Sequence, residues 1–165
     1  MSDAADEVDR IVAAWRRTSP DLDVTPLTVF SRVARLARHL ELARREAFAG
    51  QGLEVWEFDV LTALRRTPGR ELSPGALVEQ TLSTSGTMTN RVDRLAARGL
   101  VERLPDPQDR RGVRVRITAA GAELADAALR RLLDSERATL ARLTRAETEA
   151  LAGLLRRLLG DFEAG

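Results

Sequence analysis

The spacing of apolar residues predicts a chain made mainly of amphipathic helices. Apolar side chains recur at helical intervals over residues 4–18, from Pro26 to about residue 48, and over 54–66. Thr25 followed by Pro26 is typical of a helix start, because proline at the first helical position loses no hydrogen bond. Thr144 and Glu147 have the spacing of a capping box and begin the last helix. That helix carries one continuous apolar face: Leu151, Leu154, Leu155, Leu158, Leu159 and Phe162.

Shorter elements are predicted in the middle of the chain. After residue 66 come a break at "TPGR", a short extended piece "REL", and a helix over 74–80 that follows Ser73. The polar turn "TLSTSG" leads into a helix from about residue 85 to 98, ended by Gly99. "LVERL" and "VRVRIT" then alternate as two strands of a hairpin, and Thr118 is expected to cap a long helix through residue 143.

This order of elements, helix, short strand, helix, turn, helix and hairpin, is typical of a winged helix-turn-helix. The DNA major groove admits one α-helix, and the N-terminal residues of the second helix of the motif meet the base edges. Short polar side chains stand at that end of the helix here, and an arginine follows one turn later. The alternative interpretation is that a start rich in serine and threonine only caps the helix. The predicted DNA contacts from this helix are Ser83, Ser85, Thr87, Thr89, Asn90 and Arg94.

The hairpin turn lies in "PDPQDRRGVRVRIT", residues 105–118, and is rich in arginine. Arg110 and Arg111 at its tip are predicted to contact an adjacent minor groove or the DNA backbone, where arginine is favoured. Arg114 and Arg116 alternate with valines and are expected on the solvent face of the strand. Taken alone, the turn would be interpreted as a solvated β-turn; its place after the polar helix favours a wing.

Charge distribution agrees with a local phosphate contact. The 165 residues carry a net charge of +1, and every basic residue is arginine. Residues 91–116 hold eight arginines and four acids, a balance of +4, whereas residues 1–24 have a balance of −3. A concentrated basic segment in a nearly neutral protein is what binding to a polyanion needs.

Composition argues against several other classes of function. The chain has no cysteine and a single histidine, His39, so thiol chemistry, disulfides and zinc sites of cysteine or histidine are excluded or hard to build. No nucleophile and base pair is apparent, so no enzymatic activity and no cofactor are expected. No apolar run reaches membrane-spanning length and no signal-peptide pattern begins the chain, which makes a cytoplasmic location the default expectation.

The segment "ELSPGALVEQTLSTSGTMTNRVDRLAARGLVERLPDPQDRRGVRVRITAAG" resembles the MarR family of bacterial transcription regulators, most specifically over residues 99–121. The resemblance implies a mainly α fold with a small β-hairpin, in which N- and C-terminal dimerisation helices flank the winged helix-turn-helix. It divides one domain, 1–165, into residues 1–50, a DNA-binding part over 53–118, and helices over 119–165. It also implies that Asp109 steadies the wing, and that a homodimer represses transcription from a palindromic operator until a small ligand releases it.

Within that family the chain resembles the urate-responsive branch, which has an extra N-terminal helix. The matching positions are Trp15, Asp59, Arg66, Arg91 and Arg103. The resemblance implies that Trp15 and Arg91 hold a planar anion, such as urate, a polycarboxylate or a phenolic acid, and that this anion disturbs Asp59 and Arg103. The alternative interpretation is that Trp15 packs in a core and that Asp59 and Arg66 form a structural ion pair. The protein would then be a ligand-independent or architectural DNA-binding regulator.

Overall fold

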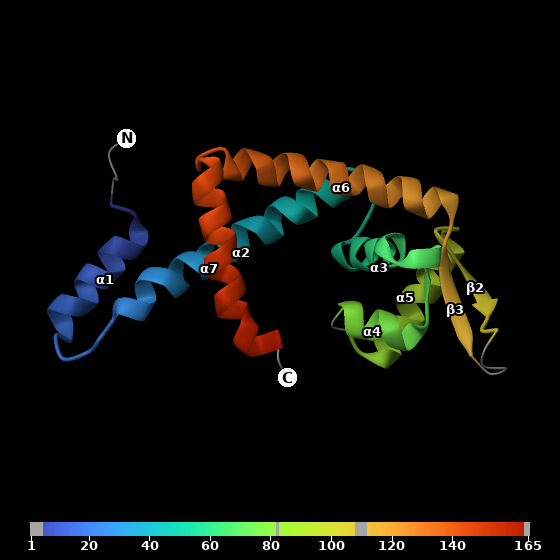
Figure 1. Cartoon of the computed structure of the whole chain (residues 1–165), viewed down its shortest axis with the longest axis horizontal. Helices are drawn as coiled ribbons and strands as arrows, with labels where there is room; N and C mark the ends of the chain where they lie inside the picture. The colour runs from blue at the N-terminus through green and yellow to red at the C-terminus, as the bar shows by residue number, and fades with distance from the viewer. Residues whose placement is uncertain (1–4, 82, 108–111, 164–165) are drawn as a thin grey trace. The chain divides into compact units, whose positions relative to one another are not determined.

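The computed structural model describes residues 5–81, 83–107 and 112–163 (Figure 1). The chain divides into two compact units, Met1–Arg44 and Arg45–Gly165. The first contains α1, Glu7–Thr18, and most of α2, Thr25–Ala49. The second contains α3, Val55–Arg66, a 3-10 turn at Pro68–Arg70, and the elements that follow: β1 Glu71–Leu72, α4 Pro74–Thr81, α5 Ser85–Ala97, β2 Val101–Pro105, β3 Val113–Ile117, α6 Ala119–Leu140 and α7 Arg145–Glu163.

A small apolar cluster and an ion-pair cluster hold the first unit together. Val8 and Val12 of α1 are buried with Val24, which precedes α2. Arg32 of α2 binds Asp6 at 2.9 Å and Asp9 at 2.8 Å. Asp6 also accepts the backbone N–H of Asp9 as the N-cap of α1. That backbone hydrogen bond and the Arg32 guanidinium hold the pKa of the Asp6 carboxyl below its usual value.

The sheet of the second unit has three antiparallel strands in the order β1-β3-β2. β2 and β3 form the predicted hairpin, with Arg103 opposite Val115 and Pro105 opposite Val113. The short extended piece predicted near residue 71 is β1, which pairs Leu72 with Val115 on the other edge of β3. The sheet therefore ties the wing to the connection between α3 and α4.

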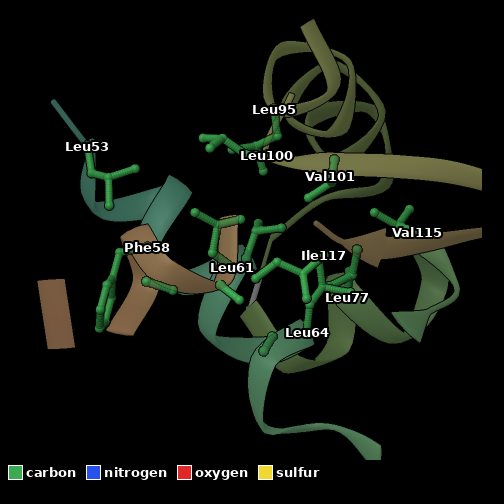
Figure 2. Packing of buried hydrophobic residues seen from close by; sticks show 14 of the residues in the cluster. Leu53, Phe58, Leu61, Leu64, Leu77, Leu95, Leu100, Val101, Val115 and Ile117 are labelled. Carbon is green, nitrogen blue, oxygen red and sulfur yellow. The ribbon is translucent and has the colours of Figure 1, made fainter. Parts of the chain in front are cut away.

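One continuous hydrophobic core supports this unit (Figure 2). Leu61 and Leu64 of α3, Leu77 of α4 and Leu95 of α5 are fully buried, and Val115 of β3 closes the core from the sheet. Phe48 at the end of α2 stacks on Phe58 of α3 with ring centroids 4.1 Å apart. Burial of these side chains fixes the orientation of α5 relative to α3 and α4, because a closely packed core tolerates little rearrangement.

Two glycines make the turn from α5 into the sheet and the start of α6 possible. Gly99 follows the end of α5 with a φ of 68°, the left-handed conformation that glycine adopts without strain. At Gly121 a Cβ would stand 2.1 Å from the Leu100 carbonyl oxygen. Thr118 accepts the backbone N–H of Gly121 and donates to the Gly99 carbonyl, so the predicted cap is confirmed and also anchors the helix to the preceding turn.

The fold is mainly helical with a small antiparallel sheet, and it is a winged helix-turn-helix with helices on both sides in the sequence. The predicted capping box of the last helix is present, since Thr144 donates to Glu147 and accepts its backbone N–H. α6 ends at Leu140, three residues before its predicted end. Within the described residues, no helix is long and apolar enough to cross a membrane.

Candidate nucleic-acid interface

Helix α5 presents a polar face to solvent. Met88, Val92 and Leu95 point into the core, at the spacing of one buried helix face. The predicted contacts on this helix are exposed: Ser85, Thr87, Thr89, Asn90 and Arg94. This burial pattern leaves the opposite side of the helix free to enter a groove.

The hydroxyl groups near the start of α5 are engaged in local hydrogen bonds. Ser83 is half-buried and shares a hydrogen bond of 2.9 Å with Thr81. Thr87 shares one of 2.8 Å with Thr84, and Thr89 donates to the Ser85 carbonyl at 3.4 Å. The residue at the N-cap of α5 is Thr84, and its side chain makes no capping hydrogen bond, so these bonds do not support the interpretation that the polar start only caps the helix. The exposed hydroxyls keep acceptor capacity toward solvent.

Asn90 provides a side-chain amide on the exposed face of α5. Among the residues that the structure describes, its side chain has no hydrogen-bond partner, and it stands near the centre of the exposed side of α5. An unengaged amide can donate and accept at once, which suits the edge of an adenine base.

Arg94 is exposed but already paired within the protein. Its guanidinium donates to Glu54 at 2.8 Å and lies 4.8 Å from the centre of the Trp56 ring. The Trp56 indole N–H donates to the other oxygen of Glu54 at 2.6 Å. Arg91, which the resemblance assigns to ligand binding, lies 5.4 Å from the same ring.

A second arginine of this region pairs with a buried carboxylate. Arg98, which follows α5, donates to both carboxylate oxygens of Glu57 at 2.7 Å and to the Gly52 carbonyl at 3.0 Å. Glu57 is only 2% exposed and also accepts the backbone N–H of Glu54. The pair joins the end of α5 to the beginning of α3, two segments 41 residues apart.

Arg103 connects the sheet to α5. From β2 it forms an ion pair with Asp93 at 2.7 Å and donates to the Thr89 carbonyl at 3.5 Å. Displacement of Arg103 would therefore act directly on the helix that carries the predicted DNA contacts.

Asp59 and Arg66 lie on one wall of a small pocket between α3 and α4. The pocket measures about 210 Å³, and its other lining residues are Thr62, Gln80 and Thr81. Arg66 donates to Gln80 at 3.1 Å. Neither Arg91 nor Arg103 lines this pocket, so the structure brings together two of the residues in the predicted ligand set and places the two arginines elsewhere in the unit.

Trp15 belongs to the first unit and is 47% exposed there, so it is not a core residue of that unit. It lines an open apolar pocket of about 330 Å³ with Leu22, Asp23, Val24, Pro26 and Leu27. A half-exposed indole beside an apolar cavity can stack on a planar molecule.

The wing is braced by an ion-pair network. Arg114 is half-buried and binds Asp106 at 3.2 Å and Glu71 at 4.0 Å, while Arg116 binds Glu71 at 2.7 Å and Glu102 at 3.7 Å. Arg114 and Arg116 lie on the more exposed face of β3, as expected, while Val115 and Ile117 on the other face are buried. The expectation did not include their ion pairs with Glu71 of β1, Glu102 of β2 and Asp106. The predicted contacts Arg110 and Arg111, and their predicted brace Asp109, lie outside the described residues.

Sequence reasoning missed the pairing of Glu54 and Trp56 with Arg94. The two residues stand at the start of a helix, where an acid is ordinary, and nothing local points to an arginine 40 residues later. The available signal was the arginine spacing on α5, since Arg91, Arg94 and Arg98 share one side of the helix. Among the described residues, no group of carboxylates and histidine could hold a metal ion.

Comparison with known proteins agrees with this geometry. The model of the MarR family matches residues 51–112. The HTH-type transcriptional regulator PecS of Dickeya dadantii is 33% identical over 153 residues, which are 92% of this chain and 92% of PecS. The chain belongs to the MarR family. As a MarR-family protein it is a DNA-binding transcriptional regulator and not an enzyme.

Solved MarR-family structures share the fold. A cysteine-to-serine mutant of MarR from E. coli, complexed with operator DNA, is 26% identical, has a TM-score of 0.69, and aligns over 84% of this chain and 99% of its own. BpsR of Bordetella bronchiseptica, whose DNA binding is regulated by 6-hydroxynicotinic acid, is 28% identical with a TM-score of 0.67, over 79% of this chain and 91% of its own.

Proposed function

We propose that this MarR-family regulator is a homodimeric repressor that leaves a palindromic operator when a small anionic ligand binds. The observation that carries the proposal is that α5 buries its apolar face in the core and exposes its polar face to solvent. In a dimer, two such helices would enter major grooves about one helical turn, ~34 Å, apart. The predicted base contacts are Ser85, Thr87, Thr89 and Asn90, with Ser83 at the turn, Arg94 beyond them, and Arg110 and Arg111 at the wing.

Exposed apolar faces on the flanking helices support a homodimer. α7 exposes Leu154, Leu158 and Leu159, and Phe162 is 84% exposed. α2 exposes a second apolar stripe. A contiguous apolar helix face left in solvent is typical of a surface that another chain covers, and a second copy of the same chain is the commonest partner. These helices flank the DNA-binding elements in the sequence, as the predicted organisation of one domain requires.

Two separate charged sites of this unit support release by an anion. Arg103 links β2 to α5 through Asp93, and Asp59 lines a pocket with Arg66. An entering carboxylate or urate anion competes for such guanidinium groups and would shift α5. The coupling expected between ligand and DNA is about 1–3 kcal/mol. The regulation of BpsR by 6-hydroxynicotinic acid is a related example of a planar anion acting on DNA binding. Trp15 and Arg91 remain the predicted ligand contacts.

The test is a fluorescence anisotropy titration with a duplex that the wild-type chain selects from a random-sequence pool. Arg111→Ala should weaken binding to every duplex and lower the salt slope by about 0.9, the value of one phosphate contact. Arg145→Ala, on α7, is the control and should leave both unchanged. Urate, 6-hydroxynicotinate and trans-aconitate are then added, and an effector should release the wild-type complex. The same compound should leave an Asp59→Asn, Arg66→Gln variant bound.

Tryptophan fluorescence separates the ligand assignment from the DNA assignment. An effector that uses Trp15 should quench the emission of Trp56→Phe, in which Trp15 is the remaining tryptophan. Unchanged emission of Trp56→Phe with an effector that releases the DNA removes Trp15 from the ligand site. If no anion releases the DNA although binding is sequence-specific, the ligand-independent regulator replaces the proposed repressor.

A further inference from the structure

Arg94 of α5 is neutralised inside the protein before any DNA is present. Glu54, immediately before α3, accepts a hydrogen bond from the Arg94 guanidinium at 2.8 Å, and the Trp56 ring lies under the same guanidinium at 4.8 Å. Both charged side chains are about half-exposed, Arg94 at 54% and Glu54 at 57%. The pair is therefore open to solvent and to a competing anion.

The position of Arg94 puts this pair at the edge of the predicted DNA surface. On a helix with 100° between residues, Arg94 lies beside Asn90 and on the side opposite Met88, Val92 and Leu95. A guanidinium there can turn toward a DNA phosphate or back toward Glu54. Because carboxylate and phosphate oxygens both accept charge-assisted hydrogen bonds from a guanidinium, a DNA phosphate can replace Glu54 as the partner of Arg94.

We propose that Glu54 is an intramolecular competitor of DNA for Arg94. Its carboxylate occupies the guanidinium in the free protein and must release it when Arg94 binds a backbone phosphate. Glu54 thus holds the DNA affinity below the value that the arginines of α5 would provide alone. This inference rests on the proposed function, in which Arg94 is a DNA contact.

Trp56 keeps the competitor in place. Its indole N–H binds the second Glu54 oxygen at 2.6 Å. This hydrogen bond and the one from Arg94 hold the pKa of the Glu54 carboxyl below its usual value, because both favour the charged carboxylate. The neighbouring pair of Glu57 and Arg98 differs, because transfer of Arg98 to a phosphate would leave the buried Glu57 carboxylate without its cation.

Glu54→Gln is the direct test, because glutamine keeps the size of the side chain and removes its charge. Affinity is measured by anisotropy at several salt concentrations, on the selected duplex and on a fixed 30-base-pair duplex of random sequence. The variant should bind both duplexes about two- to fivefold more tightly, the range of an exposed ion pair, with a salt slope steeper by up to about 0.9. Glu79→Gln, an exposed acid on α4, is the matched control and should change neither value.

A double variant separates competition from general repulsion between Glu54 and DNA. In an Arg94→Gln background, Glu54→Gln should add no affinity, because the guanidinium that was competed for is gone. A gain that persists in that background overturns the inference, and so does an unchanged or weaker affinity of Glu54→Gln itself. Thermal unfolding midpoints of the variants, compared with the wild type, show that the affinities belong to folded protein.

Trp56 fluorescence provides a second measurement with Glu54 intact. In a Trp15→Phe chain, saturating random duplex should change Trp56 emission as Arg94 leaves the ring, and Arg94→Gln should remove this response. Unchanged Trp56 emission on binding contradicts the inference. The proposed function has a different failure: it is refuted if the wild type binds no selected duplex more tightly than the random one. The two failures can be told apart because the competition between Glu54 and DNA does not depend on the base sequence.

Discussion

At the scale of single residues, ion pairs between charged side chains connect segments that are distant in the sequence. Glu57 is an example: a charged side chain that is 2% exposed is stable only because Arg98 and the backbone N–H of Glu54 satisfy it. The pair holds the end of α5 against the start of α3. The orientation of the predicted DNA-contact helix thus depends on a buried carboxylate as well as on apolar packing.

At this scale, we expect Arg98→Met to destabilise the protein. Methionine retains an apolar stem but leaves the buried Glu57 carboxylate without its cation, which should lower the free energy of unfolding by about 2–3 kcal/mol. Arg145→Met removes an exposed ion pair with Glu149, four residues later in the same helix, and should change the free energy of unfolding by less than about 0.5 kcal/mol. Urea denaturation at pH 7 measures both variants. Equal stabilities would show that the Glu57 pair has no structural role.

At the scale of elements, close backbone contacts define the junction of α5, the sheet and α6. Gly99 turns the chain with a positive φ, and Thr118 binds both the Gly99 carbonyl and the Gly121 N–H. Gly121 faces the Leu100 carbonyl so closely that a side chain has no room. These contacts set α6 against the hairpin that carries the wing.

Gly121→Ala should therefore cost about 1–3 kcal/mol of stability, because the Cβ would meet the Leu100 carbonyl oxygen at 2.1 Å and Ile117 Cγ1 at 2.9 Å. Gly153→Ala is the matched control: Gly153 lies within α7 and a Cβ there meets no atom within 4 Å. That control should be neutral or more stable by up to about 1 kcal/mol, since alanine favours helix. Thermal unfolding followed by circular dichroism compares them. A Gly121→Ala protein as stable as the wild type would refute the steric account.

For the molecule as a whole, the exposed apolar helix faces are the features that favour assembly into a dimer. The described residues of a single chain leave the leucines of α7 in solvent, and burying such a face in a second copy recovers their hydrophobic free energy. The proposed dimer would also supply the second recognition helix that a palindrome requires.

Leu158→Glu should convert a dimer into a monomer, because it places a charge on the exposed apolar face of α7. Gly160→Glu introduces the same charge on the other side of the helix, where a Cβ meets no atom, and should leave the dimer intact. Light scattering coupled to size exclusion gives the mass of each variant. If both variants stay dimeric, the interface lies elsewhere; if the wild type is monomeric, the homodimer is refuted.

Much of the fold followed from periodicity. Each predicted helix is present, most with ends within one or two residues, because caps such as Thr118 and breakers such as Gly99 act locally. β1 was foreseen only as an extended piece, since two residues have no recognisable pattern until β3 pairs with them. Pairings such as those of Arg94 and Arg114 were not predictable, because their partners lie far along the chain or across the sheet.

The sequence by itself determined the elements, their order and the family, because helix periodicity, capping and the motif over residues 99–121 are local properties of the chain. It also determined which side of α5 is polar. Only the tertiary structure decided where each charge finds its partner: Glu57 buried against Arg98, Arg94 held by Glu54 over Trp56, and Arg103 tied to Asp93. The physical reason is that an ion pair depends on distance in space, and that distance exists only after the apolar core has packed.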